Sequence, residues 1–261
     1  MKKIILIVFS LNLLFYGAFA QKGKEITLGV GGGISSVWIV NQSFYGEPEV
    51  DYAPKIGYAG SLNLGYNIDE SMAVMTEFQV SFQGQKYDGK QSFGGETYSV
   101  ERNINLRYFN IPVLFKYAFG TGGTKFRFLA GPQVGILLDA TQEYLRDDVN
   151  DGIDGNYIRI GTKALDQNNK QFVTDANNVI DRFKKTDFSL VIDIGADIHL
   201  SDLFFISAGI RGNYGLLEIN AEPYRIENLD GEYTPSHNLW GGVYFGINYK
   251  LDVQGYNQRS F

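Results

Sequence analysis

The 261-residue sequence contains no cysteine and only two histidines. Without cysteine the chain has no disulfide framework, even in an oxidising compartment. Basic residues are also in the minority, with 23 Lys and Arg against 29 Asp and Glu, for a net charge of -6. A nucleic-acid-binding surface requires clustered Lys and Arg, so we expect no nucleic-acid partner.

Long hydrophobic runs are missing as well. A membrane-spanning helix needs about 20 apolar residues, and the apolar run near the N-terminus covers only residues 4–16. Two lysines precede this run, and Ala18-Phe19-Ala20 follows it directly before Gln21. Basic residues, a short apolar core and a small-residue cleavage site are typical of a secretory signal peptide. The sequence therefore predicts a signal peptide over residues 1–20, with cleavage between Ala20 and Gln21.

Glycine and aromatic residues are abundant, with 31 Gly, 19 Phe and 17 Tyr. Helix-favouring residues dominate no long segment of the mature chain, which favours an all-β protein. Apolar residues alternate with small or polar ones at a period of two, the pattern of strands whose two faces meet different surroundings. Eight segments show this alternation: residues 25–38, 57–68, 72–83, 104–119, 125–139, 186–200, 203–217 and 239–252.

The connections between these segments alternate in length. Short, turn-forming stretches follow the second, fourth and sixth segments, whereas long polar stretches follow the others, the longest over residues 140–185. Short turns at one end and long loops at the other are typical of an outer-membrane barrel. We therefore predict an eight-stranded antiparallel up-and-down transmembrane barrel over residues 21–252, with long extracellular loops. Residues 253–261 are predicted to form a short periplasmic tail, and either Phe261 or the end of the last strand would be read by the barrel-insertion machinery.

The segment 104–119 illustrates the predicted faces. Its apolar side is predicted to meet outer-membrane lipid, and its other side, with Asn110, Pro112 and Lys116, to face the lumen. Because Pro112 and Pro132 would lie almost level on neighbouring strands and both lack an N–H, we expect a bulge or twist there. A soluble lipocalin-like carrier would reverse the faces. The mixed side carries few ions, which favours the membrane barrel.

Charged residues on the mixed faces would be costly in lipid, at about 2–4 kcal/mol for a midplane Lys or Arg. We therefore place them in the lumen, where they must pair. The predicted lumen charge network is structural and contains Glu77, Lys116, Arg127, Asp193, Asp197, Arg211 and Lys250. Lys116 is expected to pair with an acid such as Glu77 or Asp193. Eight strands leave an interior that side chains fill, and a proton or ion path is the alternative interpretation.

Enzyme and ligand sites receive little support from the sequence. His199 lies near a predicted periplasmic turn. His237 follows Ser236, and several loop acids could gather near it: Glu218, Glu222, Glu227 and Asp230. However, adjacent residues of a strand point to opposite sides. We predict no catalytic residue. The acidic stretch 147–156 does not match the spacing of a calcium loop, so no metal site is predicted and Ca²⁺ binding stays an open alternative. The glycines of residues 31–33 continue a strand pattern, so no cofactor is predicted.

Four stretches carry a resemblance to a known family. "LRYFNIPVLFKYAFG", "KFRFLAGPQVGILL", "KKTDFSLVIDIGADIHL" and "LFFISAGIRGNYGLLEIN" resemble the PorT-type outer-membrane β-barrel family common in Bacteroidetes, over roughly residues 29–251. The resemblance implies an eight-stranded outer-membrane barrel. It also implies a protein partner in an envelope or secretion complex, because the founding branch is associated with protein secretion. It assigns no residue a role.

These observations predict a non-enzymatic outer-membrane barrel that acts through its loops or its periplasmic face. The first alternative is a loop-borne hydrolase acting on lipid or peptide at the cell surface. The second is the soluble lipocalin-like carrier. In the long loop, residues 177–185 are predicted to form a short helix at the barrel mouth, with Val179 and Phe183 on one side.

Overall fold

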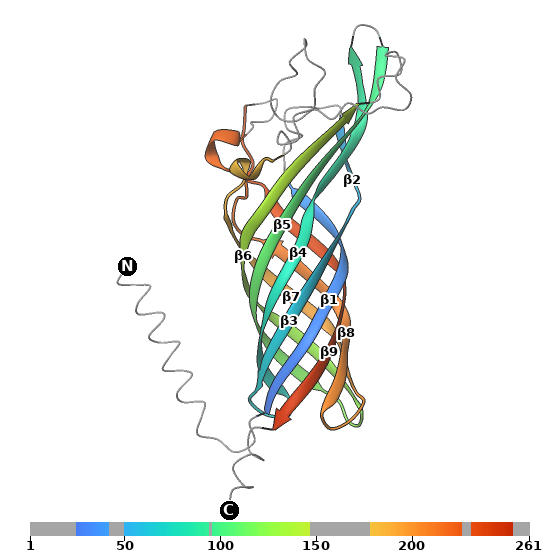
Figure 1. Ribbon diagram of the computed structural model, residues 1–261, viewed down its shortest axis with the longest axis vertical. Coiled ribbons are helices and arrows are strands. Elements are labelled where there is room, and N and C mark those ends of the chain that lie inside the picture. Colours follow the sequence, from blue (N-terminus) through green and yellow to red (C-terminus); the bar gives the residue numbers. More distant parts are fainter. Residues whose placement is uncertain (1–24, 42–49, 94–95, 147–177, 226–230, 253–261) are drawn as a thin grey trace, which may run out of the picture.

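The computed structural model describes residues 25–41, 50–93, 96–146, 178–225 and 231–252 (Figure 1). The predicted signal peptide with Ala18, Ala20 and Gln21, the acidic stretch 147–156 and the predicted tail with Phe261 lie outside these ranges. In the ranges described, no helix has the length and apolar character needed to cross a membrane.

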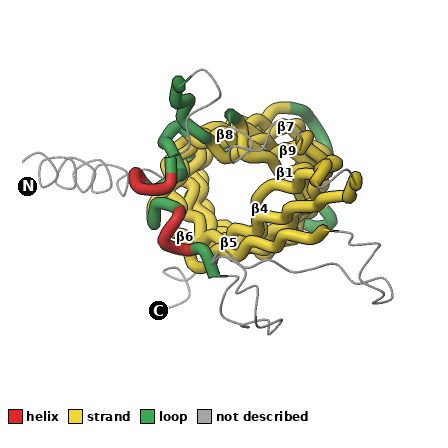
Figure 2. Tube along the Cα trace, turned by 90° about the horizontal axis from the view of Figure 1, so that it is seen from above, coloured by secondary structure: helices red, strands yellow, loops and turns green. Residues whose placement is uncertain are grey.

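Eight long antiparallel strands close into a ring, as Figure 2 shows from above. With the four-residue β2 the described residues form nine strands: β1 (Glu25–Val40), β2 (Val50–Ala53), β3 (Lys55–Asn67), β4 (Met72–Phe93), β5 (Glu96–Phe119), β6 (Thr124–Arg146), β7 (Thr186–His199), β8 (Phe204–Gly215) and β9 (His237–Asp252). Their order is β2-β4-β3-β1-β9-β8-β7-β6-β5, and pairing of β4 with β5 completes the ring. The short β2 pairs with β4 beyond the point where β3 begins. The predicted eight-stranded up-and-down barrel is confirmed.

The strand register fixes the dimensions of the ring. Following paired residues from Asp187 through each strand in turn returns to β7 at Asp197, ten residues farther along. With a rise of about 3.3 Å per residue and a strand spacing of about 4.8 Å, this stagger gives a strand tilt of about 40°. The same values place the backbone about 8 Å from the barrel axis. Side chains from opposite walls therefore meet in the middle of the lumen.

Three short turns lie at the end of the barrel where β1 begins and β9 ends, which we call the turn end (Figure 1). The turn after β3 is fixed by Asp69, whose Oδ1 accepts hydrogen bonds from the backbone amides of Ser71 and Met72 at 2.7 Å. After β5, Gly120 and Gly122 adopt φ values of 127° and 81°, which glycine reaches at low cost. The opposite end is the loop end.

One predicted loop forms parts of two paired strands. The stretch between the third and fourth predicted segments, residues 84–103, continues as β4 and β5, which pair as far as Phe93 and Glu96. The two-residue alternation persists there, with Gln85 and Tyr87 buried and Lys86 and Asp88 more exposed, but polar residues on both faces made it look like a loop. At the loop end, β4, β5 and β6 project beyond the strands on the far side of the ring (Figure 1). We call this projection the β4–β6 extension.

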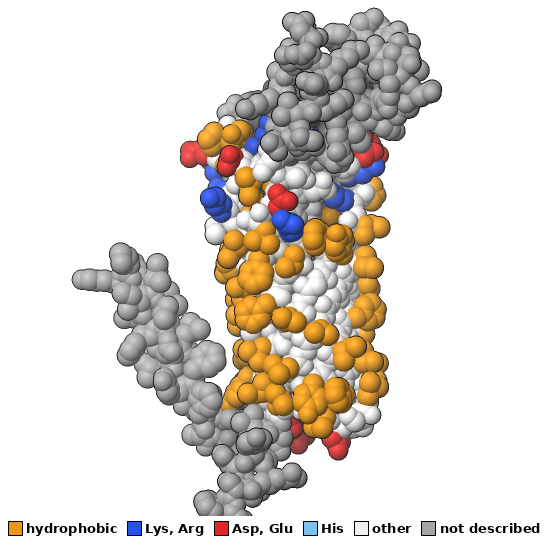
Figure 3. Space-filling model, viewed as in Figure 1, with side chains coloured by type: hydrophobic (Ala, Val, Ile, Leu, Met, Phe, Trp, Pro, Cys, Tyr) orange, Lys and Arg blue, Asp and Glu red, His pale blue; other side chains and the backbone are white. Residues whose placement is uncertain are grey.

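The outer face of the ring is apolar. On β5, Val113, Phe115, Tyr117 and Phe119 are 47–53% exposed, and Figure 3 shows many hydrophobic side chains on the face of the barrel wall that is in view. Aromatic pairs lie near the turn end of this outer face, including Phe204 with Tyr249 at 4.8 Å between ring centroids. A lipid-facing surface flanked by aromatic residues is typical of outer-membrane barrels. The soluble-carrier alternative was wrong, since apolar side chains point outward and charges inward.

The strand irregularity differs from the one predicted at the prolines. Pairing on both sides of Pro112 keeps a constant register, although pairs are missing from the ladder next to it. The missing N–H is therefore tolerated without a bulge, and the Pro112 carbonyl accepts a hydrogen bond from Thr76 Oγ1 at 3.0 Å. The register of β5 against β6 instead shifts between Arg107 and Tyr108.

Candidate functional site

An apolar cluster, which we call the plug, fills the lumen toward the loop end. Inward side chains of four strands meet three side chains from the connecting segments, Val179, Phe183 and Ile219. The remaining members are Ile39, Tyr87, Ile104, Leu106, Tyr108, Leu137 and Ala140. The segment carrying Val179 and Phe183 forms a 3-10 turn, η3 (Ile180–Arg182), in place of the predicted short helix. Its predicted position at the barrel mouth agrees with the structure.

Backbone hydrogen bonds tie the plug segments to the barrel. The Val179 amide donates to the Ala140 carbonyl at 2.9 Å, and the Leu137 amide donates to the Lys185 carbonyl at 2.8 Å. The two plug segments also bond to each other, since the Lys184 amide donates to the Ile219 carbonyl at 2.7 Å. The plug is therefore a continuation of the sheet rather than a loosely inserted loop.

A network of charges fills the lumen toward the turn end. Arg211 on β8 reaches across to Glu77 on β4 with two parallel hydrogen bonds of 2.7 and 2.9 Å, and its Nε donates to Asp193 Oδ2 at 2.9 Å. Its guanidinium also lies 3.8 Å from the ring centroid of Tyr244. Bidentate Arg–carboxylate pairs combine strength with a fixed geometry. Arg211, only 2% exposed, therefore links opposite walls of the barrel.

Arg127 extends the network farther toward the turn end by joining Asp193 to Asp197. Its Nη2 lies 3.1 Å from Asp193 Oδ1 and its Nε lies 3.3 Å from Asp197 Oδ1, although neither contact has the alignment of a hydrogen bond. Asp197 also accepts a hydrogen bond from Ser207 Oγ at 2.7 Å and pairs with Lys116. Lys116 thus contacts Asp197 and not Glu77 or Asp193, the partners expected from the sequence.

At the turn-end mouth, Lys250 stands apart from the other predicted network residues. Its Nζ lies 3.8 Å from Glu25 Oε2, and both side chains are partly exposed. Lys250 and Lys116 also lie 5.8 and 5.2 Å from the ring centroid of Phe205. The structure therefore brings six of the seven predicted residues into one connected network and places the seventh at its rim.

Between the plug and the charge network lies a polar layer of amides and hydroxyls. Asn110 Nδ2 donates to Gln79 Oε1 at 3.2 Å and to Ser81 Oγ at 2.8 Å. On the facing wall, Ser189 Oγ accepts hydrogen bonds from Gln133 and Asn213 at 3.1 and 2.8 Å. Asp187 lies at the loop-end border of this layer and bonds to Asn238.

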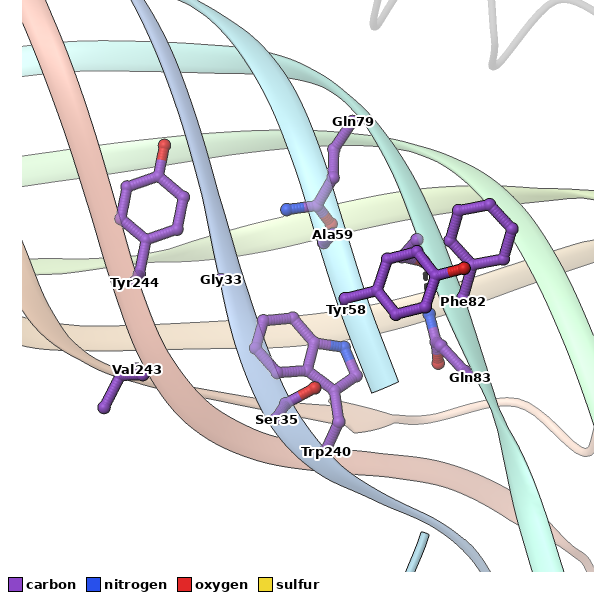
Figure 4. Close-up of a pocket in the computed structure, with 11 residues that line it drawn as sticks. Gly33, Ser35, Tyr58, Ala59, Gln79, Phe82, Gln83, Trp240, Val243 and Tyr244 are labelled. Atoms are coloured by element: carbon purple, nitrogen blue, oxygen red, sulfur yellow. Dashed lines mark hydrogen bonds between the residues drawn. The ribbon is translucent and has the colours of Figure 1, made fainter. Parts of the chain in front are cut away.

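A small cavity adjoins the polar layer beside β1, where Gly33, Ser35 and Ala59 leave space (Figure 4). The Trp240 indole and the side chains of Gln83 and Tyr244 also line it. Its volume of about 20 Å³ is room for about one water molecule. The Trp240 Nε1–H has no hydrogen-bond partner among the described residues. A water-sized molecule fits here and a larger solute does not.

The two histidines lie far from a catalytic arrangement. His237 stacks on Tyr214 with 5.7 Å between ring centroids, whereas the neighbouring Ser236 is buried and its Oγ accepts a hydrogen bond from Asn220 Nδ2 at 3.0 Å. His199 stacks on Phe205 at 5.3 Å. Of the loop acids considered with His237, Glu227 and Asp230 lie outside the described residues, and Glu222 is exposed in a second 3-10 turn.

Glu218, the remaining loop acid, organises the loop before β9. It accepts hydrogen bonds from the Ser236 amide at 2.9 Å, the Asn220 amide at 2.7 Å and the Tyr233 hydroxyl. Burial, and then the hydrogen bond to Glu218, raise the pKa of Tyr233 to about 12. Glu218 therefore holds the loop in place through these hydrogen bonds. In the described ranges, no three His, Asp or Glu side chains gather where they could hold a metal ion.

Two features were missed by sequence reasoning. The plug depends on contacts between segments far apart in the chain, which no local pattern reveals. Asp187 shares its inward parity with Ser189 and Asp193, so alternation alone was enough to place it in the lumen, yet it was not included in the charge network.

Comparisons with known proteins give a family match and several solved structures of low sequence identity. A family model for the outer membrane protein beta-barrel domain matches residues 19–220. Among solved structures, Neisserial surface protein A is 12% identical, with 88% of this chain and 100% of that chain covered and a TM-score of 0.42. The attachment invasion locus protein of Yersinia pestis is 12% identical with the same coverage and a TM-score of 0.38. OprG from Pseudomonas aeruginosa is 10% identical over 89% of this chain and 98% of that one, with a TM-score of 0.37. No curated protein matches the sequence.

Proposed function

The chain belongs to the outer membrane protein beta-barrel domain family, and on that premise we propose that it is a non-enzymatic barrel which engages another protein through its loops or its periplasmic face. The single observation that carries this proposal is the filled lumen. The plug, the polar layer and the charge network follow one another along the barrel axis. Solute transport through this interior therefore has little support.

The β4–β6 extension supports a contact on the outer side. It carries β4 and β5 past the apolar outer face, and its outward residues include charged pairs such as Lys86 with Glu101 at 2.9 Å. Because paired strands are more rigid than a free loop, less conformational entropy is lost when a partner binds to them. The resemblance to the PorT-type family supports an envelope or secretion complex as the setting of this contact.

Catalysis by the loops is the weaker proposal. A nucleophile and its base need to lie within about 2.6–3.2 Å, whereas Ser236 bonds to Asn220 and His237 stacks on Tyr214. Within the loop residues that the structure describes, no observation favours a hydrolase over an interaction surface.

Site-specific photocrosslinking in native outer membranes tests the proposal. A photoreactive residue at Asp88 samples the β4–β6 extension, and one at Asp202 samples a turn at the periplasmic face, both exposed positions. The matched control is Leu62, which is 61% exposed on the lipid-facing wall. We expect a discrete protein adduct from Asp88 or Asp202 and none from Leu62. If neither test position gives an adduct beyond the Leu62 background, the proposal fails.

A further inference from the structure

Asp187 differs from every other buried acid of the described chain. Four acidic side chains are buried: Glu77, Asp187, Asp193 and Asp197. Three of them contact Arg or Lys at salt-bridge distance within the charge network. In that network three acids balance Arg211, Arg127 and Lys116. Asp187, 8% exposed, has no such partner among the described residues, so no Arg or Lys contact there balances its charge.

The surroundings of Asp187 supply oxygen atoms. Asn238 Nδ2 donates to Asp187 Oδ2 at 2.9 Å and to the Tyr108 hydroxyl at 3.3 Å, so the three side chains form one cluster. Asn238 and Tyr108 are 2% and 1% exposed. Oδ1 of Asp187 and Oδ1 of Asn238 receive no hydrogen bond from the described residues. A buried acceptor without a donor is costly, particularly when it is charged.

Three basic groups on the strands that surround this cluster form no salt bridge with Asp187. Arg211 is held by Glu77 and Asp193. Arg102 lies six residues before Tyr108 on β5, beyond the plug residues Ile104 and Leu106. His237 precedes Asn238 on β9 and stacks on the ring of Tyr214. The cluster therefore has three oxygen-bearing side chains directly beneath the apolar plug. Among the described residues no Arg or Lys contacts its carboxylate, and His237 is a base close enough to act on Asp187 electrostatically.

We propose that Asp187, Asn238 and Tyr108 form a binding site for a single monovalent cation, either an alkali-metal ion or an ammonium group. One positive charge balances the one unpaired carboxylate. A single carboxylate with two neutral oxygens is a poor site for Ca²⁺, which takes six to eight oxygen ligands, and for Mg²⁺, which demands near-ideal octahedral geometry. An ionisable group inside a membrane-spanning structure is a functional-site hypothesis by default, and among the described residues no Arg or Lys contacts this carboxylate. This site is independent of the proposed partner surface.

Unfolding of the refolded barrel at constant ionic strength and pH tests the site. Sodium, potassium or ammonium chloride is exchanged stepwise for the chloride of N-methyl-D-glucamine, which is too large for the buried cluster. We expect a small cation to stabilise the barrel with saturation, so that 100 times its dissociation constant raises the folded-to-unfolded ratio about 100-fold. Asp187→Asn should abolish this dependence, because it removes the charge and keeps the shape.

Asp139→Asn is the matched control, since Asp139 is an exposed acid that faces Arg107 at 3.6 Å; it should retain the cation dependence. The proposal is overturned if wild type does not distinguish small cations from N-methyl-D-glucamine, or if Asp187→Asn responds like wild type. A dependence on pH that is equal in all salts also overturns it, because Asp187 would then bind a proton or pair with protonated His237. Should Asp187→Asn fail to fold, wild-type crystals grown with rubidium chloride decide: an anomalous peak beside Asp187 supports the site, and none there rejects it.

Discussion

At the scale of single residues, a few buried ion pairs hold the walls of the lumen together. In each pair, contact with the opposite charge replaces hydration by water. Removing one member of a buried ion pair leaves its partner charged and unpaired, which costs far more than losing an exposed pair. Glu77 and Arg211 are 1% and 2% exposed, whereas Lys86 and Glu101 are each 30% exposed at a similar distance of 2.9 Å. The two pairs therefore offer a direct comparison within one protein.

Glu77→Gln is expected to lower the free energy of unfolding by about 3–5 kcal/mol, because Arg211 keeps only Asp193 as an acidic partner. Lys86→Gln should cost less than about 1 kcal/mol. Urea unfolding of the refolded barrel, followed by tryptophan fluorescence, measures both. Equal losses for the two variants would show that the Glu77–Arg211 pair does not stabilise the barrel.

The Tyr233 phenol is expected to titrate near pH 12. Its pKa is raised by burial and by the hydrogen bond to Glu218, so the protonated phenol is the form favoured in the folded state. Its contribution to stability is complete below the ordinary tyrosine pKa of about 10 and is lost as the pH rises through about 12. The difference in tyrosinate absorbance between wild type and Tyr233→Phe isolates this one group. Glu218→Gln should move its midpoint toward 10, and an unmoved midpoint would contradict the assigned cause.

At the scale of strands, much of the barrel could be predicted and some boundaries could not. The period-two alternation placed eight strands and their outward faces, because one face meets lipid along its whole length. Beyond the membrane this constraint disappears, so the continuation of β4 and β5 through residues 84–103 looked like a loop. The plug residues Val179 and Ile219 likewise depend on long-range contacts. By contrast, the lumen charges followed from strand parity, since a charge on the opposite face would lie in lipid.

The close approach of β5 and β6 near Pro112 and Pro132 depends on Gly131. A Cβ there would lie 2.0 Å from the Val113 carbonyl oxygen, on the neighbouring strand. Gly131→Ala is therefore expected to destabilise the barrel by roughly 1–3 kcal/mol or more through overpacking. Gly241→Ala is the control, because a Cβ at Gly241 meets nothing within 4 Å. Urea midpoints of the two variants measure the difference, and a Gly131→Ala barrel as stable as Gly241→Ala would disprove the tight approach.

At the scale of the whole molecule, the plug and the charge network close the lumen independently of each other. They lie at opposite ends, with the polar layer between them. A change that opens one end leaves the other closed. We therefore expect a single substitution to leave ion conductance unchanged. A double variant, with one substitution in the plug and one in the charge network, tests whether the two together close the lumen.

In planar lipid bilayers, wild type and Phe183→Ala are both expected to show no steady ion conductance. Phe183 is 3% exposed in the plug, so its truncation loosens the loop end while the charge network still fills the turn end. Combining Phe183→Ala with Glu77→Gln should permit conductance, since both barriers are then weakened. Steady conductance through wild type would instead identify the protein as an open channel and remove the main support for its proposed function.

The seam of the ring also sets the order in which the protein can be assembled. The first and last strands pair along sixteen residues, from Glu25 with Asp252 to Val40 with His237. The long closing ladder is therefore non-local in sequence, a topology associated with slow folding. Arg211 and Glu77 come from strands on opposite walls, so they can meet only as the wall curls round. Until that moment Glu77 needs water or an assembly factor, whereas Arg211 can already pair with Asp193 on the neighbouring strand. We therefore expect ring closure and the neutralisation of Glu77 to occur in one step.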